Sequence, residues 1–184
     1  QVLPQDSDNF NSVTTPFDDI VYALDMFYDG GDKMYFGTVS GLLVIDITNY
    51  KKILYHGNKR GNQTFPQDQI SNVYKDKRGL LWLGNNDGLT IWNQKKDTLY
   101  FFNKESGLCD NLIKGITEDN FNNIWVPTSN GLSILTVRPT STGDFIFSSK
   151  NYSVKDGLAN NYFNDRAFCK LQNNDIVICY LNAQ

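Results

Sequence analysis

A repeat with a spacing of 43 residues is the feature that most constrains this chain. The segment 70–91 reads like the segment 113–134, and an earlier copy, 23–44, lies 47 residues before the first of these. Each copy has an Asp, an aromatic residue six positions later and a Gly-Leu pair twelve and thirteen positions later. The three Asp residues are Asp29, Asp76 and Asp119. A chain that repeats at this period is built from stacked structural units.

Each repeat predicts four short strands joined by tight turns. The apolar residues of 81–83 and 89–92 follow the patterns of buried and half-buried strands, and 98–102 is an aromatic strand. Turn-forming residues separate these segments at 76–79 and 86–88. Helical repeats of similar length need long runs without glycine, whereas here Gly or Asn recurs every six to ten residues. Four strands in about 43 residues are typical of a propeller blade.

We therefore predict an all-β fold made of β-propeller blades of four antiparallel strands. The chain 1–184 is interpreted as a single partial β-propeller of about three and a half blades. The blade-like repeats are expected at about 20–60, 68–104, 111–150 and 163–184, the last one cut short. A compact four-bladed ring is the alternative. An open arc would leave strand edges uncovered, which favours contact with a second copy of the chain, such as a homodimer.

The repeat resembles the two-component-regulator propeller repeat. The resemblance covers about residues 20–182 and is most specific in Ile70–Trp92 and Ile113–Leu135. It implies an incomplete propeller whose full ring has about seven blades. It also implies the periplasmic sensor region of a hybrid two-component system histidine kinase from glycan-degrading gut bacteria. The expected function is then non-enzymatic recognition of a glycan-derived ligand, with transmission to a cytoplasmic histidine kinase. The remaining blades of the parent protein are expected partners.

Charge and hydropathy exclude some classes of function. The formal net charge is -3 and the pI is about 5.0, whereas nucleic-acid binding requires a basic surface. No apolar run is long enough to span a bilayer. Because Gln1 is not an initiator Met, we expect the sequence to start inside a larger gene product, a mature secreted form or an expression product.

Candidate catalytic and metal-binding residues are few, and we predict none of either kind and no cofactor. His56 is the only histidine, and no nucleophile motif lies near it. Glu118 and Asp119 are adjacent, so on a strand their side chains point to opposite faces and cannot act together as a glycosidase pair. The recurring Asp residues are interpreted as turn caps. A propeller lyase or glycosidase and a structural protein-docking propeller remain the alternatives.

The three cysteines form no CxxC motif. Cys169 and Cys179 could face each other across a hairpin through 173–174 and form a disulfide. The interpretation that we favour is that the cysteines are buried apolar thiols.

Ligands of propellers bind on the face where the innermost strands begin. Here that face gathers the loops 107–114 and 160–164 and the turns 85–87 and 129–130, which are rich in Asn and Asp. Such side chains suit hydrogen bonds to an oligosaccharide or another small ligand. Trp92 is added because the other repeats have aliphatic residues at its position. The predicted ligand-binding residues are Asp87, Trp92, Asn111, Lys114 and Asn130.

Overall fold

The computed structural model describes residues 22–60 and 63–180, which form an all-β structure. The first four-stranded sheet contains β1 (Ala23–Tyr28), β2 (Lys33–Thr38), β3 (Gly41–Asp46) and β4 (Lys52–Tyr55). The second contains β7 (Asn72–Lys75), β8 (Leu80–Asn85), β9 (Gly88–Asn93) and β10 (Thr98–Phe102). The third contains β11 (Thr117–Glu118), β12 (Ile124–Thr128), β13 (Gly131–Pro139) and β14 (Phe145–Tyr152). In each sheet, strands that follow one another in sequence pair antiparallel.

Two sheets of two strands each and one helical turn lie between and after these four-stranded sheets. β5 (Lys59–Arg60) pairs with β6 (Gln63–Thr64), and β15 (Phe163–Lys170) pairs with β16 (Ile176–Tyr180). One 3-10 turn, η1 (Val154–Asp156), is the sole helical element within the described ranges. The predicted fold class of antiparallel four-stranded sheets is confirmed, while the number of blades in the ring stays a prediction.

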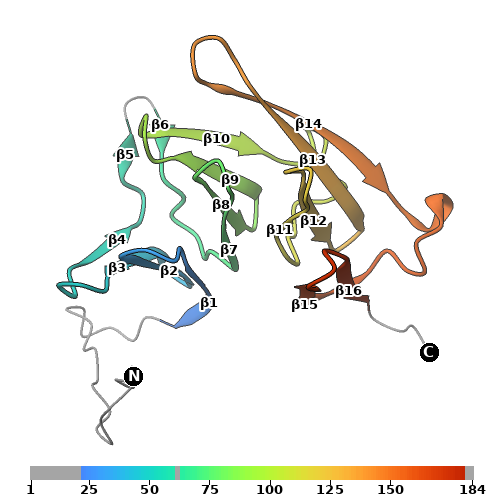
Figure 1. The fold of residues 1–184 in the computed structure, drawn as a ribbon, viewed down its shortest axis with the longest axis horizontal. Helices are drawn as coiled ribbons and strands as arrows, with labels where there is room; N and C mark the ends of the chain where they lie inside the picture. The colour runs from blue at the N-terminus through green and yellow to red at the C-terminus, as the bar shows by residue number, and fades with distance from the viewer. Residues whose placement is uncertain (1–21, 61–62, 181–184) are drawn as a thin grey trace, which may run out of the picture.

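The sheets follow one another along an arc (Figure 1). Strands β1, β7, β11 and β15 lie toward the inside of the arc, and β4, β10 and β14 lie toward its outside. Two hydrophobic cores fill the spaces between the four-stranded sheets. One core joins Tyr35 and Leu42 of the first sheet to Leu83 of the second, and the other joins Trp82 of the second to Val126 of the third. Burial between the sheets, rather than within any one of them, stabilises this arrangement.

The recurring Asp closes the turn between the first two strands of each sheet. Asp76 Oδ1 accepts bonds from the backbone amides of Arg78 and Leu80, each at 2.9 Å. Asp76 Oδ2 accepts the indole Nε1–H of Trp82 at 2.9 Å, which ties the turn to the core. The predicted role of these Asp residues as turn caps is confirmed.

Asp119 repeats this geometry in the third sheet. It accepts the amides of Phe121 and Asn123, each at 2.8 Å, and the Nε1–H of Trp125 at 3.0 Å. Burial alone would raise the pKa of Asp119, but the donors on Asn123 and Trp125 outweigh it and hold the pKa below its ordinary value. The carboxylate is therefore kept ionised by the turn that it closes.

In the first sheet, different residues provide the hydrogen bonds to the turn carboxylate. Tyr35 replaces Trp and has no Nε1–H for Asp29, and its hydroxyl group instead donates to Gln94 Oε1 at 3.2 Å. Lys75 of the neighbouring sheet fills the gap, because its Nζ donates to Asp29 Oδ2 at 2.9 Å and to the Tyr35 hydroxyl at 3.3 Å. Asp29 Oδ1 still accepts the Gly31 amide at 3.0 Å. A residue of the next blade thus completes the motif.

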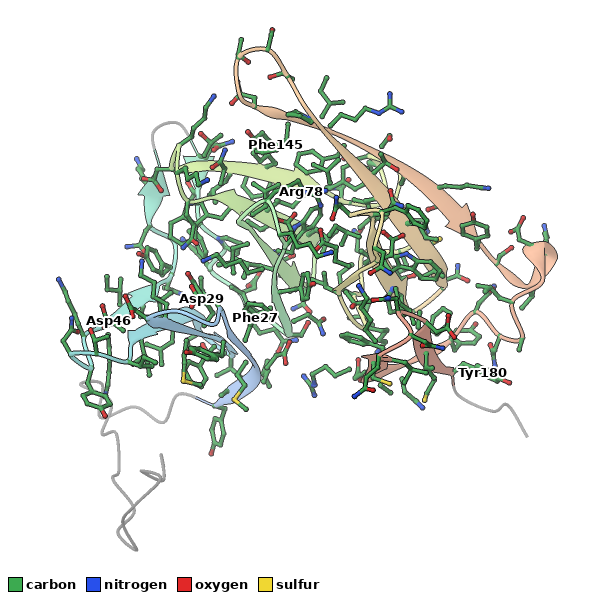
Figure 2. All side chains as sticks on the ribbon, in the orientation of Figure 1. Phe27, Asp29, Asp46, Arg78, Phe145 and Tyr180 are labelled. Atoms are coloured by element: carbon green, nitrogen blue, oxygen red, sulfur yellow. The ribbon has the colours of Figure 1, made fainter. Side chains whose placement is uncertain are left out.

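The β13–β14 hairpin extends over the outer strand of the second sheet. Lys96 Nζ pairs with Asp144 Oδ1 at 3.1 Å, and the ring of Tyr100 packs on Phe145 and Phe147 at centroid distances of 6.4 and 5.2 Å. Figure 2 labels Phe145 on this hairpin, beside β10. These contacts join the second and third sheets at their outer rim, in addition to the core between them.

The outer edge of β10 is also partly blocked by a side chain. The amide side chain of Gln63 donates to the Leu99 carbonyl and accepts the Leu99 amide at 2.7 Å. Both backbone groups of one edge residue are thereby satisfied within the chain. This reduces the ability of β10 to recruit a further strand.

The cysteine prediction needs correction. Cys169 lies opposite Val177 in the β15–β16 pair, and Cys179 lies two residues further along β16. Both cysteines are free and exposed, so the expectation of buried thiols was wrong for these two, and the disulfide is not formed. The reason is that β15 and β16 form a sheet of two strands, which leaves much of each strand exposed.

Trp82→Phe should destabilise the protein by about 2–4 kcal/mol, because it removes a buried indole, its packing volume and a donor to a buried carboxylate. Trp125→Phe is the matched control, since Trp125 makes the same bond but is only partly buried. We expect its cost to be about 1 kcal/mol. The measurement is the free energy of unfolding in urea. Equal losses in both variants would contradict the proposed role of burial between the sheets.

Candidate functional site

A cavity of about 510 Å³ lies at the end of the second sheet where its innermost strand, β7, begins. It is formed by the β8–β9 turn, the loop before β7 and the loop after β10. This is the face on which the sequence predicted ligand binding. Its lining residues are Pro66, Gln67, Asp68, Asn85, Asp87, Leu89, Thr90, Phe101, Asn103, Glu105 and Asn111.

Two buried polar residues line the cavity. Asn85 ends β8, and its Nδ2 donates to the hydroxyl oxygen of Thr90 on β9 at 3.0 Å. Asn85 Oδ1 accepts the amide of Asp87 at 2.9 Å, which sets the direction of the turn. Gly88 has a φ of 115°, and a Cβ there would lie 2.7 Å from the Phe102 carbonyl. The turn can therefore pack against the end of β10 only because residue 88 is glycine.

Asparagine side chains fix the loop after β10, which forms one rim of the cavity and is called the rim loop below. Asn111 Oδ1 accepts the amide of Lys104 at 2.7 Å, which closes the segment 104–111 of the loop after β10. Asn103 Oδ1 accepts both the amide and the hydroxyl of Ser106 at 3.0 Å. These bonds fix the backbone on both sides of Glu105, which is exposed at the cavity.

Phe101 contributes an aromatic surface. It lies on β10 opposite Thr90, and its side chain is 52% exposed, whereas the adjacent Phe102 is buried. An exposed aromatic ring beside amide and carboxylate groups can stack on the apolar face of a sugar while the polar groups bind its hydroxyls. The side chains around the cavity are therefore chemically suited to binding a ligand.

The five predicted ligand-binding residues do not lie together in the structure. Asp87 and Asn111 line the cavity. Trp92 is buried in the core beside Tyr55 and Phe65 and donates to Asp97 at 3.0 Å. The reason is that its position on β9 faces the first sheet.

Lys114 and Asn130 lie near the fourth repeat. Lys114 Nζ pairs with Asp165 at 2.9 Å, and Asn130 Oδ1 accepts from Asn161 at 3.3 Å. Neither residue lines the cavity. The role of all five residues in ligand binding stays a prediction.

Several lining residues were missed by the sequence analysis. Asn85 fell within the loops that the sequence predicted, but it was not chosen because every turn of this chain is rich in Asn. Phe101 was missed because alternation in 98–102 does not say which face the neighbouring blade covers. Gln67, Asp68 and Glu105 lay outside the loops that the sequence selected. Only their spatial convergence distinguishes these residues.

A second cluster of charged residues lies at the opposite end of the sheets, between the second and third. Arg78 Nη2 lies 2.9 Å from Asp76 Oδ2 and 3.7 Å from Glu118 Oε1, and Arg78 Nη1 donates to the Asn122 carbonyl at 2.7 Å. Figure 2 labels Arg78 at this position. Glu118 Oε2 accepts the Lys77 amide at 3.2 Å, but Oε1 finds no hydrogen-bond donor in the described part of the chain. The side chain of Glu118 is 1% exposed.

Glu118 departs from the pattern of the repeat. Its counterpart 43 residues earlier is Lys75, which forms a direct ion pair with Asp29 of the preceding sheet. At position 118 a carboxylate instead faces the Asp76 carboxylate, and Arg78 lies between them. Burial raises the pKa of Glu118, and the charge of Asp76 raises it further. Burial and the same two carboxylates raise the pKa of Tyr74 to about 12.

Glu118→Gln should make the protein more stable relative to the wild type as the pH rises above about 4. A carboxyl with a raised folded pKa stabilises the fold when protonated, and this contribution is lost as the pH rises through that pKa. Gln keeps the Lys77 bond but cannot ionise. Urea unfolding between pH 4 and 8 measures the difference. A difference between Glu118→Gln and the wild type that stays constant across this pH range would refute the assignment.

Comparison with known proteins agrees with the resemblance inferred from the repeat. Residues 64–87, which run from β6 to the β8–β9 turn, match the family described as two component regulator propeller. A search of curated proteins finds no match. None of the described helices is long and apolar enough to cross a membrane.

Two solved structures from B. thetaiotaomicron have a similar fold. The extracellular domain of the hybrid two component system BT3049 matches with a TM-score of 0.70 and 24% identity, over 92% of this chain and 22% of that chain. The extracellular domain of the hybrid two component system BT4673 matches with a TM-score of 0.59 and 18% identity, over 91% of this chain and 26% of that chain. This chain spans about a quarter of the length of those domains. It thus carries a two-component regulator propeller repeat and shares its β-sheet architecture with extracellular domains of hybrid two-component systems.

Proposed function

We propose that this chain is a non-enzymatic, ligand-binding part of an extracellular sensor, and that its ligand is an oligosaccharide derived from a glycan. The observation that carries the proposal is the exposed ring of Phe101 above a cavity lined by amide and carboxylate side chains. The cavity has a volume of about 510 Å³, which falls within the range of about 300–1,000 Å³ found for small-ligand sites.

The position of the cavity suits signal transmission. Its walls include the loop that leads into the second sheet and the loop that leads from it to the third. A ligand that binds these loops with different affinity in two arrangements of the blades would shift the population of those arrangements. In the proposed parent protein, this shift would reach a cytoplasmic histidine kinase from the periplasm.

We further propose that the remaining blades of the parent protein cover the end of the arc beyond β16. Tyr35 and Trp82 are 0% exposed because the following sheet covers them, and Trp82 packs on Phe147 of β14 at 5.8 Å. Trp125 is followed by the two strands β15 and β16 and remains partly exposed, beside a hollow lined by Ile176 and Val177. This surface is the counterpart of one that is buried elsewhere in the arc. A second copy of the chain could occupy it when those blades are missing.

Phe101→Ala should weaken binding of an oligosaccharide by about fivefold, because stacking on the ring contributes about 1 kcal/mol. Binding is measured by isothermal titration with a panel of neutral, amino and acidic oligosaccharides. Phe121→Ala is the matched control, since Phe121 is 84% exposed but lies on the turn between β11 and β12.

The same samples are assayed for turnover of each oligosaccharide. Heat of binding without turnover supports the sensor, and turnover would favour a propeller lyase or glycosidase instead. The absence of both from the whole panel would contradict saccharide binding and favour a protein-docking role.

A further inference from the structure

The charged residues around the cavity define which saccharides it can accept. Asp68, Asp87 and Glu105 line it from three different segments, namely the loop before β7, the β8–β9 turn and the loop after β10. All three residues are exposed at the surface. Among the described residues that line the cavity, none is Lys, Arg or His. The lining therefore has three negative charges and no compensating positive one.

The other polar groups of the lining are neutral. Gln67, Asn85, Asn103 and Asn111 have amides, and Thr90 has a hydroxyl group. These groups can bind sugar hydroxyls but cannot neutralise a carboxylate or a sulfate. Positive groups near this region are directed elsewhere or lie outside the lining: Lys114 pairs with Asp165, and Lys104 belongs to the rim loop but not to the cavity wall.

A shared metal ion does not account for the three carboxylates. Within the described residues, no three His, Cys, Asp or Glu side chains are placed to hold one metal ion together. The carboxylates instead surround a space large enough for sugar rings. At such a site, each would attract an ammonium group and repel an anion, and the effect would weaken with salt.

We propose that this cavity selects saccharides by charge: it favours sugars with free amino groups, accepts neutral sugars less well and rejects sugars that carry carboxylate or sulfate groups. The inference rests on the proposed function, because it names the class of ligand for the same cavity. The aromatic ring and the amides supply binding to any sugar, and the carboxylates supply the discrimination.

The test uses three β-1,4-linked trimers that differ in charge: trimers of glucosamine, glucose and glucuronic acid. Isothermal titration at low and high salt should give the tightest binding for the glucosamine trimer and no binding for the glucuronic acid trimer. Asp68→Asn, Asp87→Asn and Glu105→Gln combined should weaken the glucosamine trimer about tenfold, leave the glucose trimer within about twofold and remove the salt dependence. Asp32→Asn, at an exposed carboxylate between β1 and β2, is the matched control and should change nothing.

The possible failures are distinguishable. If the wild type binds the glucuronic acid trimer as tightly as the glucosamine trimer, and Phe101→Ala weakens both, charge selection is refuted while saccharide binding stands. If the glucosamine trimer binds equally well to the triple variant, charge selection is also refuted. If none of the trimers binds, and none of the oligosaccharides of the wider panel binds either, the proposed function fails and this inference fails with it.

Discussion

A carboxylate at the first turn of each four-stranded sheet is the group on which the blades depend, and its strongest link to the core is the bond from the indole of Trp82 to Asp76. It joins a solvent-facing turn to a side chain in the core between two sheets. One oxygen of the carboxylate organises the turn, and the other orients the ring. A flat sheet of short strands would otherwise have little to determine how it stacks on the next one. The same arrangement recurs at Asp119 and, with Lys75 as a substitute donor, at Asp29.

This constraint divides the structure into two ends. At the end with the Asp turns, the carboxylates accept hydrogen bonds from their own turns and from side chains at the interfaces between the sheets. At the other end, the loops between the sheets bury Phe65, Ile70 and Ile113 in the cores, while polar residues of these loops and of the turns between the second and third strands face the cavity. Asn85 occupies the position that Thr38 and Thr128 hold in the other two sheets. The cavity lies at this variable end, on the blade that has the replacement.

Glu118 shows that the repeats also differ from one another at the end with the Asp turns. A cation at position 75 joins two blades directly, whereas a buried carboxylate at position 118 requires Arg78 as a mediator. Such a charge cluster contributes little net stability, because the cost of burying its members offsets their attraction. Its effect is to place a buried carboxylate in the contact between the second and third sheets.

Much of the fold could be predicted from the sequence. The repeat spacing, the Asp residues of the turns and the aromatic residues six positions later are local patterns, and in the second and third sheets the hydrogen bonds between Asp and Trp close within the blade. The candidate site could be predicted only in part: the face was identified, with Asp87 and Asn111 on it, but Phe101, Asn85 and Glu105 were not. Their importance arises from convergence of three segments.

What the sequence by itself determined is the blade, because its strands and turns are set by contacts between residues close in the chain. What only the tertiary structure decided is which faces are covered. The sequence predicted Trp92 as a ligand contact, yet the first sheet packs over it. The side chain of Phe101 on the next strand is exposed. The physical reason is that burial depends on how neighbouring sheets stack, and stacking brings together residues whose separation in the sequence carries no periodic signal.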